Sequence, residues 1–287
     1  MSDDPIEQAG NGPDLTRRRL LLAGAACAVC AVGGAVGGAL YGRRTALSGR
    51  TDVGARTRTR GSRAFVQPDG LFNIRTDVPV VALTFDDGPD PKYTPQVMRL
   101  LDRANARATF FLIGVNAVAH PDLVAAHRRA GHSIGNHTYD HRELELLGAD
   151  QVNLEIERAQ RALVTAGALR PTLFRPPKGY TDEVVGVLAD AHRYRTVFWD
   201  ACVERFVNHV PVKEGVKQLL AKVGPGSIVL AHDGGLVTGS GRPPLSRTRT
   251  IEALPMILAG LGAMGLEVVD VPTLLRRTDT PLLQTLT

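Results

Sequence analysis

The sequence predicts an α/β fold: a distorted (β/α) barrel of about seven parallel strands, preceded by an N-terminal apolar helix and a linker. From Val78 onward, short apolar runs of strand length alternate with stretches of helical periodicity. Polar residues able to do chemistry follow the ends of several apolar runs, as expected where parallel strands converge on one face. An open doubly wound sheet is the alternative arrangement.

Each element follows from its own pattern. Strands are expected over the apolar runs 78–85, 108–113, 133–136, 172–175, 195–200, 227–232 and 266–271. Helices are expected between them, at 94–101, 121–130, 150–166, 182–191, 212–223 and 250–262. Thr94-Pro95 marks a helix start, because proline fits the first helical turn.

The N-terminal region has a different composition from the rest. Leu20–Tyr41 carries no charge and is long enough to span a bilayer as a helix. It follows Thr16-Arg17-Arg18-Arg19-Leu20-Leu21, which resembles a twin-arginine export signal. We therefore predict an exported protein, either anchored in the membrane facing outside or secreted after signal cleavage. The expected domains are 1–41 for signal or anchor, 42–77 for a flexible basic linker, 78–277 for the main domain and 278–287 for a tail.

The charge distribution limits the choice of partners. Of the 287 residues, 1–63 contain ten arginines and five acidic residues, which leaves 24 basic and 24 acidic residues in the remainder. The net charge of +5 thus belongs to the N-terminal arm and indicates contact of the arm with a membrane surface, and no nucleic acid binding by the domain. Cys202 is the only cysteine of the main domain, so this domain has no internal disulfide.

Two motifs place metal-binding chemistry at strand ends. Thr84-Phe85-Asp86-Asp87-Gly88-Pro89 aims two adjacent carboxylates out of a sharp turn. His137-Thr138-Tyr139-Asp140-His141 spaces two histidines four apart, which puts them on one face of a helical turn. Two histidines and one aspartate make a three-ligand set for a catalytic zinc-like ion. Taken alone, each motif also fits an ordinary turn or surface pair.

Two further motifs follow in order, Arg175-Pro176-Pro177-Lys178-Gly179-Tyr180 and Leu230-Ala231-His232-Asp233. Together the four motifs resemble those of the polysaccharide deacetylases with a NodB-homology domain, carbohydrate esterase family four, over about residues 76–275. The resemblance implies that Asp86 is the catalytic base, His232 the general acid, and Arg175 the residue that positions Asp86. It implies that Asp87, His137 and His141 bind a divalent metal, zinc first, with cobalt or manganese as alternatives. Substrate-binding residues are expected at Pro176, Pro177, Tyr180, Trp199 and Leu230.

The sequence departs from the family pattern at one motif. The family's Asp-x-x-Asp-Trp falls on Cys202-Val203-Glu204-Arg205-Phe206, so Arg205 stands where an aspartate supports the catalytic histidine. Asp200 or Glu204 is a candidate replacement. In the third motif, Lys178 stands where the family has an aromatic residue.

The function implied is a metal-dependent hydrolase that removes N-acetyl groups from a cell-wall or extracellular polysaccharide, such as peptidoglycan or a chitin-like polymer. Two alternatives remain open from the sequence. An O-acetyl esterase of the xylan type would use the same site and would need less help for its leaving group. A non-catalytic glycan-binding module that retains the metal would account for the altered fourth motif.

Overall fold

The structure is a computed structural model, and it describes residues 70–235 and 246–280. The chain divides into two units, 1–50 and 51–287, and every described residue belongs to the second. The predicted export segment Leu20–Tyr41 lies outside the described residues. Within the described part of the chain, no helix is both long and apolar enough to cross a membrane.

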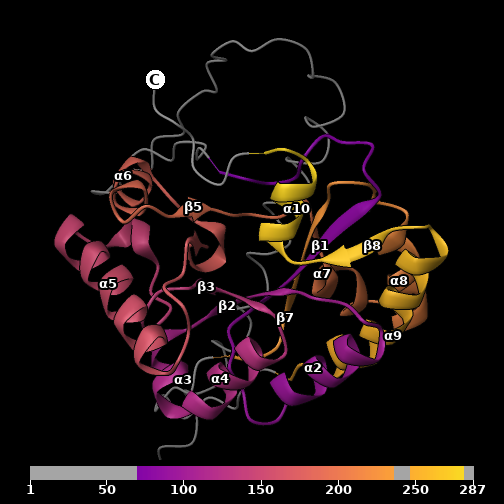
Figure 1. The fold of residues 1–287 in the computed structure, drawn as a ribbon, viewed down its shortest axis with the longest axis horizontal. Helices are drawn as coiled ribbons and strands as arrows, with labels where there is room; N and C mark the ends of the chain where they lie inside the picture. The colour runs from indigo at the N-terminus through magenta and orange to yellow at the C-terminus, as the bar shows by residue number, and fades with distance from the viewer. Residues whose placement is uncertain (1–69, 236–245, 281–287) are drawn as a thin grey trace, which may run out of the picture. The chain divides into compact units, whose positions relative to one another are not determined.

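A parallel sheet of eight strands forms the centre of the domain (Figure 1). Its strands are β1 Val80–Asp86, β2 Thr109–Leu112, β3 Ser133–Asn136, β4 Leu173–Phe174, β5 Arg195–Thr196, β6 Ala201–Cys202, β7 Ile228–His232 and β8 Glu267–Val269. The order is β5-β4-β3-β2-β1-β7-β6, with β8 paired to the first residues of β1. This confirms the predicted α/β fold, a distorted barrel. Within the described residues the barrel is open, because its end strands β5 and β6 are not hydrogen-bonded to each other.

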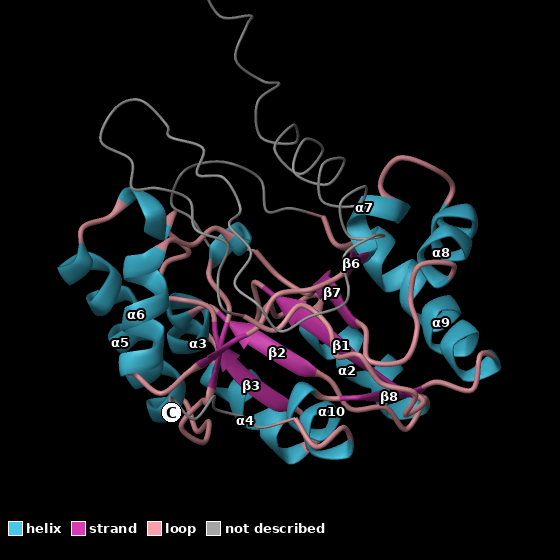
Figure 2. Cartoon of the chain, turned by 90° about the horizontal axis from the view of Figure 1, so that it is seen from above, coloured by secondary structure: helices cyan, strands magenta, loops and turns pink. Residues whose placement is uncertain are grey.

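Helices cover the outside of the sheet, and Figure 2 shows α3, α5 and α6 on one side and α7, α8 and α9 on the other. The helices are α2 Thr94–Arg103, α3 Gly114–Ala119, α4 Pro121–Arg129, α5 Ala149–Thr165, α6 Glu183–Ala191, α7 Val203–Val207, α8 Val212–Leu220, α9 Thr248–Ala263 and α10 Val271–Arg277, with 3-10 turns η1 Leu144–Leu146 and η2 Pro177–Gly179. Three short helices, α3, α7 and α10, were not expected, because each is too short for its apolar residues to repeat at helical spacing.

The strand predicted over 195–200 is wrong in its second half. The chain leaves β4 at Val197, whose amide makes the last hydrogen bond to the Phe174 carbonyl. From there it pairs with Leu71, which forms a bridge with Val197 and accepts a hydrogen bond from the Phe198 amide. It then pairs again as β6 beside β7. This break matters for the site, since it decides where the residues after Trp199 point.

The domain begins before Val78. Leu71 is buried, and the Phe72 ring stacks on Phe198 with 4.5 Å between centroids. Asn73 forms a bridge with Ser227, just before β7. Residues 70–77, which the sequence assigned to the linker, therefore pack as part of the domain.

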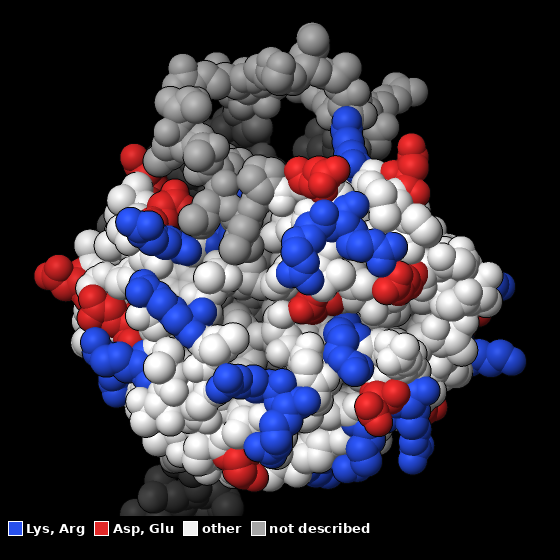
Figure 3. Space-filling view, in the orientation of Figure 1, with Lys and Arg blue, Asp and Glu red and all other residues white. Residues whose placement is uncertain are grey.

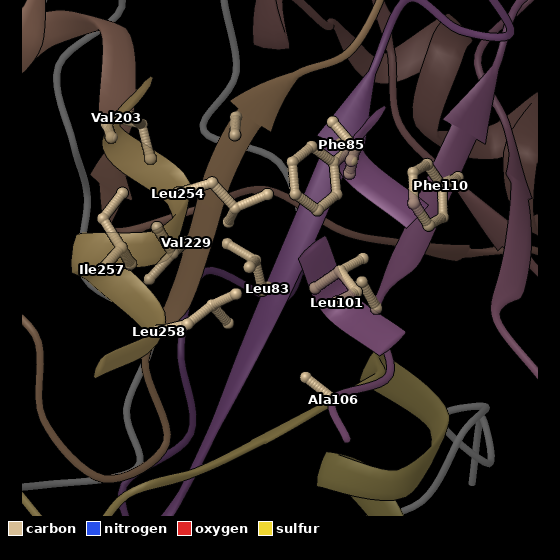
Figure 4. Close-up of a cluster of buried hydrophobic side chains, with 14 of the residues drawn as sticks. Leu83, Phe85, Leu101, Ala106, Phe110, Val203, Val229, Leu254, Ile257 and Leu258 are labelled. Carbon is tan, nitrogen blue, oxygen red and sulfur yellow. The ribbon is translucent and has the colours of Figure 1, made fainter. Parts of the chain in front are cut away.

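The core packs α9 against β1 and β7 (Figure 4). Leu254, Ile257 and Leu258 recur at helical spacing and are buried, facing Leu83 and Val229 of the strands. This layer fixes the carboxyl ends of β1 and β7 beside each other. On the surface, basic and acidic side chains are interspersed over the face in Figure 3, which fits the zero net charge outside the arm.

Candidate active site

Asp86 lies at the carboxyl end of β1, opposite His232 on the neighbouring strand β7. Arg175, completely buried, donates from Nη1 to Asp86 Oδ1 at 2.7 Å and to Thr84 Oγ1 at 2.9 Å. Burial lowers the pKa of Arg175, and the Asp86 carboxylate opposes that shift. A paired guanidinium keeps the buried Asp86 carboxylate in place and compensates its charge.

The Arg175 side chain is itself fixed on every side. Nε donates to the Val197 carbonyl and Nη2 to the Phe198 carbonyl, each at 2.9 Å. The guanidinium carbon Cζ of Arg175 lies over the Phe111 ring, 4.1 Å from the ring centroid. The orientation of Arg175, and through it that of Asp86, is therefore set by the backbone around the β5–β6 break.

Asp87 follows β1 in the left-handed region, with φ of 73°. A non-glycine residue there is strained by about 1–3 kcal/mol and stays only where its surroundings hold it. Asn116 Nδ2 donates to the Asp87 carbonyl at 2.9 Å. Gly234 packs so close that an added Cβ would lie 2.5 Å from that carbonyl oxygen. The turn sends the Asp87 side chain in a different direction from that of Asp86.

The two histidines approach Asp87 from a loop, so the predicted helical turn is wrong. Residues 137–143 are not helical, and Thr138 and His141 have φ of 68° and 61°. Glu155 of α5 accepts the amides of Tyr139 and Asp140, both at 3.1 Å. The loop folds both imidazoles inward and still brings the two histidines to one point.

These three side chains form a site that fits a divalent metal. His137 Nε2 and His141 Nε2 lie 3.5 and 3.3 Å from Asp87 Oδ1, which is buried without a hydrogen-bond partner. His137 Nδ1 lies 2.7 Å from the Arg175 carbonyl. Since a carbonyl can only accept, Nδ1 carries the proton and Nε2 presents a lone pair, as a metal-ligating histidine does. Burial acts to raise the pKa of Asp87, but the two imidazoles outweigh it and hold that pKa well below its usual range.

His232 pairs with Glu204, the first-turn residue of α7. His232 Nδ1 lies 3.1 Å from Glu204 Oε2, and the His232 amide donates to Oε1 at 2.9 Å. Thr250 donates to the same Oε1 at 2.8 Å. Burial acts to lower the pKa of His232, but the Glu204 carboxylate outweighs it and raises that pKa. Burial acts to raise the pKa of Glu204, but the nearby His232 outweighs burial and lowers that pKa to about 2.

This arrangement corrects the expectation that Arg205 lies beside His232, and it decides between the two candidate replacements. Arg205 is exposed and does not occupy the place beside His232, so its charge does not weaken that residue. Asp200 accepts from the Ile228 amide at 3.0 Å, at the start of β7, whereas His232 ends that strand. Glu204, one of the two candidates weighed, is the carboxylate that supports His232.

The five expected substrate-binding residues are all buried or half-buried. Pro176 and Pro177 are buried, and Tyr180 and Trp199 are half-buried. Trp199 packs on Gly179, whose φ of 69° a side chain would strain. Leu230 is buried in β7, in register with Thr84 of β1. Lys178, also left-handed with φ of 60°, is exposed and forms an ion pair with Glu143.

Two buried charged residues of the site were missed by sequence reasoning. Arg247 contacts Asp87, and Asp233 accepts a hydrogen bond from Thr94 at 2.5 Å. Burial raises the pKa of Asp233 to about 7. Asp233 adjoins His232 in the sequence, which was a usable signal. Arg247 gives none, because it lies 160 residues from its partner in the chain.

Comparison with known proteins identifies relatives of this chain. Residues 73–197 match the family model for polysaccharide deacetylase. The chain is 36% identical over 226 residues to a peptidoglycan-N-acetylglucosamine deacetylase of Bacillus cereus, covering 75% of this chain and 97% of that protein. It is 34% identical over 199 residues to a chitooligosaccharide deacetylase of a Bradyrhizobium strain, covering 68% and 90%. The fold matches a family 4 carbohydrate esterase from Streptomyces lividans, solved with acetate, with a TM-score of 0.59 and 32% identity, over 67% of this chain and 92% of that one.

Proposed function

The chain belongs to the polysaccharide deacetylase family, and from that premise we propose that it hydrolyses N-acetyl groups of a polymer containing N-acetylglucosamine, such as peptidoglycan or chitin-like chains. The observation that carries the proposal is the arrangement at the ends of β1 and β7. Asp86 and His232 lie in register at the ends of adjacent parallel strands, and the cluster Asp87, His137 and His141 lies beside Asp86. A base, an acid and a metal-ligand set thus meet at one point.

Asp86 acts as the base. Its Oδ1 is bound by Arg175, and its Oδ2 lies 3.7 Å from His137 Nε2, on the side of the metal ligands. A divalent ion held by Asp87, His137 and His141 would polarise the acetyl carbonyl and lower the pKa of a bound water. Asp86 would take a proton from the attacking water as the water oxygen bonds to the carbonyl carbon. Such proton transfer contributes about 10²–10⁴-fold to the rate.

His232 acts as the acid. Glu204 holds the Nδ1 side of the ring and favours the protonated imidazolium, so Nε2 is the atom that delivers a proton. As the carbon–nitrogen bond breaks, the departing nitrogen takes this proton and leaves as a free amine. The water oxygen remains on the acyl carbon, and the second product is acetate. Glu204 therefore supplies the carboxylate that the altered fourth motif had put in doubt, which removes the support for a non-catalytic module.

The η2 turn offers the donor for the developing oxyanion. The amides of Gly179 and Tyr180 already donate to the carbonyls of Pro176 and Pro177. Proline has no N–H, so among residues 176–180 the Lys178 amide is the donor left for substrate. Backbone donors of this kind contribute about 10²–10³-fold when aimed at the oxyanion. In this proposal, Leu230 contacts the acetyl methyl group and Trp199 contacts the sugar.

Metal identity and location are part of the proposal. One carboxylate with two imidazole nitrogens is a donor set that suits zinc, with cobalt or manganese as substitutes. The apolar segment Leu20–Tyr41 behind Arg17-Arg18-Arg19 supports export, with the domain outside the membrane as an anchored or a secreted enzyme. A wall polymer would be accessible to it there.

The test is acetate release by the purified chain from N-acetylated chitooligosaccharide and from peptidoglycan. The protein is stripped with a chelator and reloaded with zinc, cobalt or manganese. We expect release that depends on added metal and is lost in Asp86→Asn. Absence of release from both N-acetyl substrates by metal-loaded protein would overturn the proposal, and release from acetylated xylan alone would identify an O-acetyl esterase.

A further inference from the structure

Arg247, at the start of α9, reaches back to the turn after β1. Its Nη2 donates to Asp87 Oδ2 at 2.9 Å, and its Nε donates to the Gly234 carbonyl at 2.7 Å. The residue is 8% exposed. Two bonds from two different nitrogens of one planar guanidinium fix its orientation, which a lysine ammonium cannot reproduce.

The bond from Arg247 distinguishes the two carboxylate oxygens of Asp87. Oδ2 is occupied by Arg247, whereas Oδ1 is buried without a hydrogen-bond partner and faces the Nε2 atoms of His137 and His141. Rotation of the carboxylate would break the Arg247 bond. The Asp87 backbone cannot shift to restore that bond, because Asn116 donates to the Asp87 carbonyl and Gly234 packs against the same carbonyl.

We propose that Arg247 is a positioning residue for the metal site, which holds Asp87 so that Oδ1 alone is presented to the ion. The inference rests on the proposed function only in taking Asp87, His137 and His141 as the metal ligands. Arg247 has two opposing effects on metal affinity. Its positive charge repels a divalent cation, whereas its hydrogen bond prepares the ligand geometry before the ion arrives.

The hydrogen-bond effect is the larger one here. Two carboxylates, Asp87 and Glu204, interact electrostatically with Arg247, and their negative charges offset the positive charge of the guanidinium. Residues that orient a metal ligand typically contribute 10–100-fold to affinity. A role limited to charge would give the opposite sign, so Arg247→Gln would bind metal more tightly than the wild type. A role limited to packing would change the melting temperature and leave metal affinity unchanged.

The experiment measures zinc affinity of the full chain by competition with a chromogenic chelator, together with the melting temperature of the metal-free protein. The variants are Arg247→Gln, which removes both the charge and the planar guanidinium, and Arg247→Lys, which keeps the charge and removes the planar guanidinium. Arg249→Gln is the matched control, because Arg249 lies two residues further along the same segment. Its hydrogen bonds within the described residues go to the carbonyls of Val207 and Val210, away from Asp87.

We expect Arg247→Gln to weaken zinc binding about 10–100-fold, Arg247→Lys to weaken it by less, and Arg249→Gln to stay within about twofold of the wild type. Unchanged or tighter binding in Arg247→Gln would overturn the inference, as would an equal loss in Arg249→Gln. If Arg247→Gln does not unfold cooperatively, Arg247→Lys decides by the same criterion. A wild-type chain that binds no metal would overturn the proposed function instead, which separates the two failures.

Discussion

Replacing Glu204 by glutamine tests how the site supports its acid. The substitution keeps the shape of the side chain and its acceptor for Thr250, which donates to Oε1 at 2.8 Å. It removes the negative charge 3.1 Å from His232 Nδ1. Glu204 raises the pKa of His232 against the opposing effect of burial. Without it, that pKa falls, and less of the imidazole is protonated at neutral pH.

The size of the effect follows from the geometry of the pair. Two unit charges 3.1 Å apart attract by about 1 kcal/mol in bulk water and by about 5 kcal/mol at an effective dielectric constant of about 20. The side chains are 22% and 11% exposed, so the true value lies between these limits. Because both side chains are partly exposed, we take about 1.4–2.8 kcal/mol, in the lower part of this range. Since about 1.4 kcal/mol corresponds to tenfold in rate, we expect kcat/KM at neutral pH to fall about 10- to 100-fold.

The assay is the pH dependence of acetate release by zinc-loaded protein. His232 is active when protonated, so activity is lost as pH rises through its pKa, and Glu204→Gln should move this alkaline limb to lower pH. Arg205→Ala, which alters the exposed neighbour on α7, is the control and should leave the profile unchanged. An unshifted limb in Glu204→Gln, or a shifted one in Arg205→Ala, would refute the assignment of Glu204.

Three further variants test other parts of the site. Asp86→Asn should reduce acetate release by at least about 10²-fold while zinc still binds; loss of zinc binding as well would make Asp86 a ligand rather than the base. His141→Ala should weaken zinc binding, measured by chelator competition, by more than about 100-fold, because loss of a residue that only orients a ligand already costs about 10–100-fold. Unchanged affinity would remove His141 from the ligand set. Burial raises the pKa of Asp233 to about 7, so the folded state binds its proton more tightly than the unfolded state, and the stability of the metal-free protein should fall as pH rises from about 4 to about 7. Asp233→Asn should abolish that fall and be more stable than the wild type at pH 8, on the order of 1–3 kcal/mol by urea unfolding, whereas parallel pH curves for the two proteins would contradict it.

The strand ends were predictable because of the physics of parallel sheets. Asp86 and His232 are far apart in sequence, yet each directly ends an apolar run, and parallel strands bring such ends together. Arg175 follows β4 in the same way. The hydrophobic period identified most of the runs, so the sequence was sufficient to gather these side chains on one face.

Local geometry within the loops was not predictable in the same way. A spacing of four fits a helical turn, but His137 and His141 meet through a loop in which Thr138 and His141 are left-handed. Glu155 of α5 holds this loop by accepting the amides of Tyr139 and Asp140. Neighbouring residues of a helix point about 100° apart, so a shift of one position separates Glu204, which faces His232, from Arg205, which faces solvent. Pattern matching fixes a motif to within such a shift, and the direction of each side chain needs the structure.

Asp86 and Asp87 show how adjacent carboxylates acquire different roles. Asp86 continues β1 and is bound by Arg175, from the β4 side of the sheet. Asp87 turns away with a left-handed backbone and is bound by Arg247, from the α9 side. Each carboxylate therefore has one oxygen held by its own arginine and one oxygen directed toward the histidine cluster. Each buried carboxylate thus has a separate arginine to compensate its charge. In the proposed mechanism, this leaves one oxygen of Asp86 to accept a proton from water and one oxygen of Asp87 to hold the divalent ion.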